Sequence, residues 1–124
     1  MAHDELTIDI KTQNHGDALV YTLRGSFDVM TSPSVRAALV ESASAGNHEI
    51  VVDLTQLEFM DSTGLGALIG AHRRATENGG VVRLVVNEGT IARLLNITGL
   101  VRIFAIYHSL EDALKDHARV IATV

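Results

Sequence analysis

The chain has 124 residues, of which 47% are apolar and 20% are charged, and it contains no cysteine. That length is typical of one domain that buries its own core, and the lack of cysteine excludes a disulfide scaffold, thiolate metal sites and thiol catalysis. A net charge of −5 argues against a nucleic-acid-binding protein, because phosphate neutralisation needs clustered Lys and Arg. We therefore expect a single domain over residues 1–124, with a core at about 6–118, and no nucleic-acid partner.

The sequence carries no pattern of a secretion or membrane signal. Residues 1–13 contain acidic side chains and no apolar stretch, unlike a secretory signal. The longest apolar runs, residues 64–71 and 81–86, are far shorter than the roughly 20 residues of a membrane-spanning helix. We expect a cytoplasmic protein without membrane insertion.

The spacing of apolar side chains predicts alternating strands and helices. Strands are indicated by apolar–polar alternation or a short β-branched run, and helices by apolar side chains that recur every three to four residues. In chain order, the patterns predict strands at 6–11 and 18–23, a helix from Ser32 to Gly46-Asn47, a strand at 49–54, a helix from Asp61 to Asn78-Gly79-Gly80, a strand at 81–86, a helix at 90–96, a strand at 102–106 and a helix after Ser109. This order predicts an α/β fold: a mixed sheet of about five strands, antiparallel in the opening hairpin and otherwise parallel, with about four helices packed against it.

Particular residues support these boundaries. Ser32 is a natural N-cap with Pro33 at the first helical position, and Ser109 with Asp112 fits a capping box loosely. The β-branched run at 49–54 is typical of a strand buried on both faces, so we expect it at the centre of the sheet.

One segment places a carboxylate and a hydroxyl where this central strand passes into a helix. Asp61 and Ser62 open the helix, whose first amides lack internal partners and carry the positive end of its dipole. A side-chain oxygen or a phosphate is stabilised at such a place. Two interpretations follow: Asp61 or Ser62 only caps the helix, or Ser62 also accepts a phosphate.

The same helix contains three glycines near its start. Gly64, Gly66 and Gly70 each cost about 1 kcal/mol of helix stability relative to alanine. Gly66 and Gly70 share one face, which permits the close approach of another backbone. That backbone belongs either to a neighbouring element of the fold or to a docking protein, and the sequence does not separate the two.

Five segments between about residues 6 and 118 form a recognisable set: Leu23–Asp28, Val52–Leu54, Asp61–Gly66, His72–Ala75 and Asn96–Leu100 followed by Phe104. These segments resemble those of the anti-sigma factor antagonists of the STAS family, and they occur in the order expected for that family. The resemblance implies the STAS fold.

The resemblance also implies a phosphorylation switch. In such families the unphosphorylated antagonist binds an anti-sigma factor, often itself a serine kinase, and thereby frees a sigma factor. The kinase phosphorylates the serine that matches Ser62, and a serine phosphatase resets it. We expect Ser62 to be the phosphoacceptor and Thr63 a secondary one, with the phosphate accommodated by the helix amides and repelling the partner. The alternative is a STAS subunit of another complex, such as a signalling scaffold or a lipid-transport ATPase.

The expected partner-binding residues surround Ser62. They are Asp28, Met30, Ser32, Met60, Asp61, Thr63, Gly64 and Gly66. Asp28 has an alternative role in turn or cap chemistry. Leu65 and Ile69 are expected in the core, whereas Met60, at the end of the strand, is the better interface candidate.

No catalytic, metal or cofactor site is expected. The six histidines show no metal-ligand spacing, which favours scattered surface positions, and the phosphate-binding glycine motifs are absent. A hydrolase with Ser62 as nucleophile and Asp61 or Asp28 as partner lacks both GxSxG and a histidine tied to that serine. We therefore expect a protein that is not an enzyme and is monomeric when free.

Overall fold

A five-stranded sheet and four α-helices make up most of the described residues, 7–47 and 49–115, in the computed structural model. The elements are β1 (Ile8–His15), β2 (Ala18–Phe27), α1 (Ser32–Ser44), β3 (Glu49–Met60), α2 (Ser62–Glu77), β4 (Val81–Val85), α3 (Thr90–Ile97), the 3₁₀ helix η2 (Leu100–Arg102), β5 (Ala105–Tyr107) and α4 (Leu110–Lys115). The strand order is β1-β2-β3-β4-β5, with β1 and β2 antiparallel and the other neighbours parallel. The predicted order of elements and the mixed α/β sheet are confirmed.

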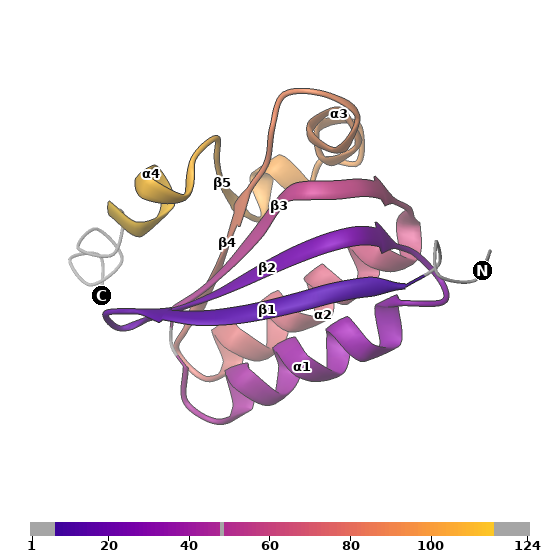
Figure 1. Cartoon of the computed structure of the whole chain (residues 1–124). Coiled ribbons are helices and arrows are strands. Elements are labelled where there is room, and N and C mark those ends of the chain that lie inside the picture. Colours follow the sequence, from indigo (N-terminus) through magenta and orange to yellow (C-terminus); the bar gives the residue numbers. More distant parts are fainter. Residues whose placement is uncertain (1–6, 48, 116–124) are drawn as a thin grey trace.

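The central strand β3 is buried on both faces where it was expected to be. Ile50, Val52 and Leu54 face the main core, which α1, α2 and α3 cover, while Val51 faces a smaller cluster that includes Ala113 of α4. Figure 1 shows α1 and α2 side by side along one face of the sheet and α4 on the other side. The sheet therefore holds the amino end of α2 at the carboxyl edge of β3.

The strand β3 is twice as long as the pattern predicted, because it ends at Met60 and not at Leu54. Polar side chains after Leu54 hide the strand in the sequence. The long partner strand β2 supports the extension, since Ser26 pairs with Phe59 and Phe27 pairs with Met60. Tertiary pairing thus overrides the local pattern.

The predicted strand at 102–106 is wrong in its first half. Leu100–Arg102 forms a 3₁₀ turn that begins after Gly99, whose φ is +78°, and β5 covers only Ala105–Tyr107. Phe104, which follows this turn, is buried and packs in the main core. The predicted positions at Leu6 and at 116–118 lie outside the described residues.

Two predicted helix caps have different outcomes. The N-cap of α1 is Thr31, and Ser32 is already the first helical residue, so the prediction for Ser32 is wrong. Ser109 does cap α4, since its Oγ accepts the N–H of Asp112 at 3.1 Å.

None of the described helices is both long and apolar enough to span a bilayer.

A buried ion pair joins two strands of the sheet. Arg83 Nη1 donates to Glu49 Oε1 at 3.0 Å, and both residues are buried, with 1% and 5% of their surface exposed. Glu49 lies on β3 and Arg83 on β4, two parallel neighbours. The sequence pattern placed both residues in strands but did not indicate that they pair.

Candidate functional site

The α2 helix begins directly after β3, and Asp61 is its N-cap. Asp61 Oδ1 accepts the N–H groups of Thr63 at 2.9 Å and Gly64 at 3.2 Å, and the Asp61 carbonyl oxygen accepts the N–H of Leu65 at 3.1 Å. Three of the first four amides of α2 are therefore engaged by Asp61. Asp61 performs the capping role that the sequence assigned to either Asp61 or Ser62.

The environment of Asp61 keeps its carboxyl group ionised. The Thr63 hydroxyl, which donates to Asp61 Oδ1, is the largest influence and lowers the pKa of Asp61 below its ordinary value of 3.8; burial opposes this, and the N–H groups of Gly64, Thr63 and Val29 lower the pKa further. A carboxylate that accepts several hydrogen bonds is stabilised in its charged form. The start of α2 already holds one full negative charge at neutral pH.

This arrangement bears on where a phosphate on Ser62 would find hydrogen-bond donors. The helix amides were expected to accommodate a phosphate on Ser62, but the amides of Thr63 and Gly64 already bind Asp61. A phosphate could take these amides only by displacing the carboxylate, and two anions in one place repel each other.

The two hydroxyl residues at the start of α2 differ in what they bind. Ser62, the first helical residue, is exposed, and within the described part of the chain its hydroxyl makes no hydrogen bond. Thr63 is also exposed, but its hydroxyl is bonded to Asp61. Of the two hydroxyl groups, that of Thr63 is therefore the one already engaged by Asp61.

Asp28 shapes the loop between β2 and α1. Its Oδ1 accepts the N–H of Met30 at 3.0 Å and that of Thr31 at 3.2 Å, and its own N–H donates to Thr31 Oγ1 at 2.9 Å. The turn role considered for Asp28 is confirmed. No hydrogen bond joins Asp28 to Ser62 among the described residues.

The same loop is tied to the start of α2. The N–H of Asp61 donates to the Phe27 carbonyl oxygen at 3.2 Å, and the N–H of Val29 contributes to stabilising the Asp61 carboxylate. Ser32, which follows the loop, is half-buried. The loop and the helix start therefore form one continuous piece of surface.

Exposed apolar side chains lie on both sides of this junction. Val29 is 63% exposed, Met30 68% and Phe59 51%. Met30 was expected here, whereas Val29 and Phe59 were missed. The period-two alternation of a strand would have revealed Phe59, because it points away from the face that buries Met60.

Two of the expected partner-binding residues are not at the surface. Met60 is only 6% exposed and belongs to the main core, so its assignment to the interface was wrong. Gly64 is also buried. Leu65 is buried and Ile69 packs against the core, which confirms the expectation for both.

The three glycines of α2 have three different surroundings. A Cβ on Gly64 would meet the Phe27 carbonyl oxygen at 2.7 Å, and one on Gly70 would meet Arg36 Nε of α1 at 3.3 Å. A Cβ on Gly66 would meet nothing within 4 Å. Gly64 and Gly70 therefore serve packing inside the fold, and Gly66 leaves bare helix backbone at the surface.

The geometry gives the metal and hydrolase alternatives no support. Residues 7–47 and 49–115 contain no group of three His, Asp or Glu side chains that could hold a metal ion. Within the same ranges no histidine bonds to Ser62. The prediction of scattered surface histidines fails at His72, which is half-buried, with its ring centroid 5.1 Å from that of Phe104. His3, His48 and His117 lie outside the described residues.

Comparisons with known proteins agree on one family. A family model described as "STAS domain" matches residues 9–113. The chain is 32% identical over 112 residues to an anti-sigma F factor antagonist of Paenibacillus polymyxa, covering 90% of this chain and 96% of the relative. It is 35% identical over 95 residues to an anti-sigma-B factor antagonist of Bacillus subtilis, covering 77% and 84%.

A solved structure is similar over nearly the same extent. The crystal structure of an anti-sigma factor antagonist from Mycobacterium paratuberculosis superposes with a TM-score of 0.81 at 27% identity. The match covers 87% of this chain and 92% of that protein. Most of this chain thus shares its fold with that anti-sigma factor antagonist.

Proposed function

The chain belongs to the STAS family, and from this premise we propose that it is an anti-sigma factor antagonist controlled by phosphorylation of Ser62. The unphosphorylated form binds an anti-sigma factor that is also a serine kinase, and this binding frees a sigma factor. Phosphorylation of Ser62 ends the binding, and a serine phosphatase restores it. The protein acts in the cytoplasm as a single domain, monomeric when free, by binding and not by catalysis.

The observation that carries the proposal is the exposed Ser62 hydroxyl at the start of a helix in which Asp61 already engages the amides of Thr63 and Gly64. Because Asp61 engages the N–H groups of Thr63 and Gly64, a phosphate on Ser62 could bind these two amides only with loss of the cap. Its charge of about −1.5 to −2 at neutral pH then adds to that of Asp61. The surface becomes strongly negative, while the fold beneath it is unchanged.

The proposed contact area, here named the Ser62 surface, combines apolar and small residues. It consists of Val29, Met30, Phe59, Ser62, Thr63 and Gly66. Exposed apolar side chains supply the attraction on docking, and the bare backbone at Gly66 permits close approach of the partner. Desolvating a phosphate in the middle of such an area is costly, which explains why modification would end the complex.

Asp28 has an indirect part in this proposal. Its carboxylate holds the N–H groups of Met30 and Thr31 and so fixes the loop that presents Val29 and Met30. Asp28 therefore positions the apolar half of the Ser62 surface. Thr63 contributes mainly by holding Asp61, so we assign it a secondary role as phosphoacceptor.

The test uses a kinase-type anti-sigma factor from the same genome together with ATP. Mass spectrometry should locate one phosphate on Ser62, and the Ser62→Ala variant should remain unmodified. In calorimetric titrations Ser62→Ala should bind the anti-sigma factor like the wild type. Ser62→Asp should bind at least about tenfold more weakly, because like charges at an interface cost binding free energy.

A matched control places the same substitution away from the site. Ser44 is exposed at the last turn of α1, at the opposite end of the helix layer, and Ser44→Asp adds an identical charge there. It should leave binding unchanged. Equal binding by Ser62→Asp and wild type would refute the electrostatic mechanism. No binding of any kinase-type anti-sigma factor would favour the alternative of a STAS subunit in a signalling scaffold or lipid-transport ATPase.

A further inference from the structure

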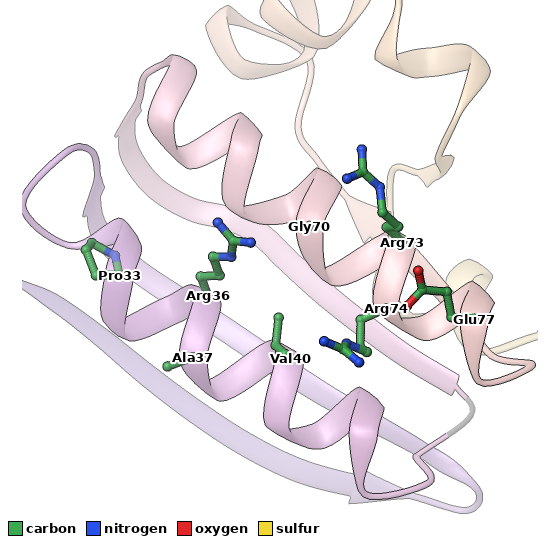
Figure 2. Close-up of a pocket in the computed structure, with 8 residues that line it drawn as sticks. All are labelled: Pro33, Arg36, Ala37, Val40, Gly70, Arg73, Arg74 and Glu77. Carbon is green, nitrogen blue, oxygen red and sulfur yellow. The ribbon is translucent and has the colours of Figure 1, made fainter.

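A groove of about 550 Å³ lies between α1 and α2. Figure 2 shows Arg36 of α1 and Arg74 of α2 reaching into the space between the two helices, with Arg73 on the outer side of α2. All three side chains are exposed. None of the three guanidinium groups forms an ion pair with a carboxylate of the described residues.

The groove is positively charged in a protein that is otherwise acidic. The guanidinium groups of Arg36 and Arg74 reach into the groove, and that of Arg73 lies on the outer side of α2; the lining residues include one carboxylate, that of Glu77, although the chain as a whole carries −5. Arginine stays charged at all ordinary pH values, and its planar fork matches the two oxygens of a carboxylate. The chemistry of the groove therefore selects an anion, and carboxylates fit it well.

The floor and shape of the groove favour a peptide over a small ion. Pro33, Ala37 and Val40 of α1 line it with apolar surface. The missing side chain at Gly70 leaves room for the Arg36 guanidinium, whose Nε and Cζ would stand 3.3 and 3.4 Å from a Cβ at that position. A segment that alternates acidic and apolar side chains would form ion pairs with the arginines and apolar contacts with the α1 side chains that line the groove.

The groove continues the Ser62 surface along α2. Ser62, Gly66, Gly70 and Arg73 are spaced by four, four and three residues, which places them along one side of the helix. At 1.5 Å per residue, Gly70 lies about 12 Å along the axis from Ser62. A partner that covers Ser62 and Gly66 would reach the groove without leaving this side.

We propose that the groove binds an acidic segment of the same protein partner that contacts Ser62. The inference rests on the proposed function. The separation of about 12 Å exceeds the screening length of roughly 8 Å at physiological ionic strength. The groove therefore attracts the partner whether or not Ser62 is phosphorylated, and it accelerates association, while Ser62 decides whether the complex persists.

The first experiment tests the groove without any natural partner. The probe is an acetylated and amidated hexapeptide of four Glu and two Leu, titrated into the whole protein at low ionic strength while NMR follows the amide shifts. The shifts should concentrate in α1 and in the second half of α2. A peptide with Lys in place of Glu should cause none.

Two triple variants of equal charge separate a local site from net charge. The groove variant replaces Arg36, Arg73 and Arg74 by Gln, and the matched control replaces the exposed Arg24, Arg93 and Arg102 by Gln. The groove variant should lose the peptide-induced shifts, and the control should keep them. Shifts spread over the whole surface, or retained in the groove variant, would refute the site.

Two further outcomes also count against the proposal. If inorganic phosphate displaced the peptide at equal charge concentration, the groove would be a small-anion site. If the same amides shifted with protein concentration alone, the occupant would be a second copy of the chain.

The second experiment uses the anti-sigma factor that binds the wild type. The groove variant should associate with it about tenfold more slowly at low ionic strength, with a weaker salt dependence, and the control variant should associate normally. Peptide binding with unchanged association would remove the partner role from the groove. Failure of the wild type to bind any anti-sigma factor would refute the proposed function, while the peptide experiment would still decide whether the groove binds acidic segments.

Discussion

Gly64 of α2 lies so close to Phe27 of β2 that a Cβ atom on Gly64 would stand 2.7 Å from the Phe27 carbonyl oxygen. That oxygen also accepts the N–H of Asp61 at 3.2 Å, and the Met60 side chain would be 2.9 Å from the added carbon. The Phe27 carbonyl oxygen cannot move away from Gly64 without disturbing its hydrogen bond to Asp61, the residue that caps α2. The close approach at Gly64 therefore sets how α2 sits at the end of the sheet.

Replacing Gly64 by alanine should destabilise the protein. Inserting a carbon into a packed core costs about 1–3 kcal/mol, which outweighs the roughly 1 kcal/mol that alanine gains in helix propensity. We expect Gly64→Ala to lower the midpoint of urea denaturation.

The matched control is Gly66→Ala. Its Cβ meets nothing within 4 Å, so it should raise the free energy of unfolding by up to about 1 kcal/mol. Equal midpoints for the two variants would show that the space around these glycines does not decide their effect.

Replacing Asp61 by alanine should cost about 1 kcal/mol at neutral pH, because the amides of Thr63 and Gly64 lose their cap. The effect should depend on pH. The pKa of Asp61 is lowered in the folded protein, chiefly by the Thr63 hydroxyl, so the carboxylate stabilises the fold above its unfolded pKa of 3.8. This contribution is lost as the pH falls through the lower, folded value.

Urea denaturation of wild type and Asp61→Ala at about pH 7, pH 5 and pH 3 checks this. The difference in the free energy of unfolding between wild type and Asp61→Ala should be constant between pH 7 and pH 5 and should become smaller toward pH 3. A gap that widens in acid would contradict the assigned direction of the pKa shift.

Removing one partner of the buried Glu49–Arg83 ion pair should be strongly destabilising. Either Glu49→Leu or Arg83→Met leaves the other charge buried between β3 and β4 without this ion pair, and breaking a buried pair in this way costs about 3–5 kcal/mol. The double variant should lose much less free energy of unfolding than the two single variants lose together, because both charges of the pair are removed.

A double-mutant cycle in urea measures this coupling. The exposed pair of Glu111 and Lys115, whose charged atoms are 3.9 Å apart, provides the comparison, and Lys115→Met should change stability by less than about 1 kcal/mol. Additive effects at Glu49 and Arg83 would mean that the two charges do not stabilise each other.

His72 should make the protein less stable in mild acid. Burial lowers the pKa of His72 below its ordinary 6.5, because the half-buried ring beside Phe104 is disfavoured when charged. The unfolded chain then binds the proton more readily. Stability is therefore undiminished above pH 6.5 and falls as the pH drops from there through the folded pKa.

NMR titration of the His72 ring gives its pKa in the folded protein directly. Urea denaturation from about pH 7.5 to pH 5 gives the slope of the free energy of unfolding against pH. His72→Phe should remove part of that slope. An unchanged slope would show that other groups account for the acid sensitivity.

Local sequence patterns determined the order of the secondary-structure elements and the position at which α2 begins. The order of strands and helices follows from apolar spacing, and the start of α2 at Asp61–Ser62 follows from the chemistry of a helix N-terminus. Both depend on residues within one or two turns of each other. The resemblance to STAS antagonists rests on equally short segments, and the family match over residues 9–113 confirms it.

Contacts between distant segments decided the rest. Met60 was taken for a surface residue because nothing nearby in the chain shows that Phe27 pairs with it, and Gly64, Gly66 and Gly70 look alike in sequence. Burial and pairing depend on which elements the sheet brings together, and that information is spread over the chain. The sequence alone marked Ser62 as the residue of interest. Only the folded chain shows that Asp61 already engages the amides of Thr63 and Gly64, and that a groove lined by arginines lies farther along the same helix.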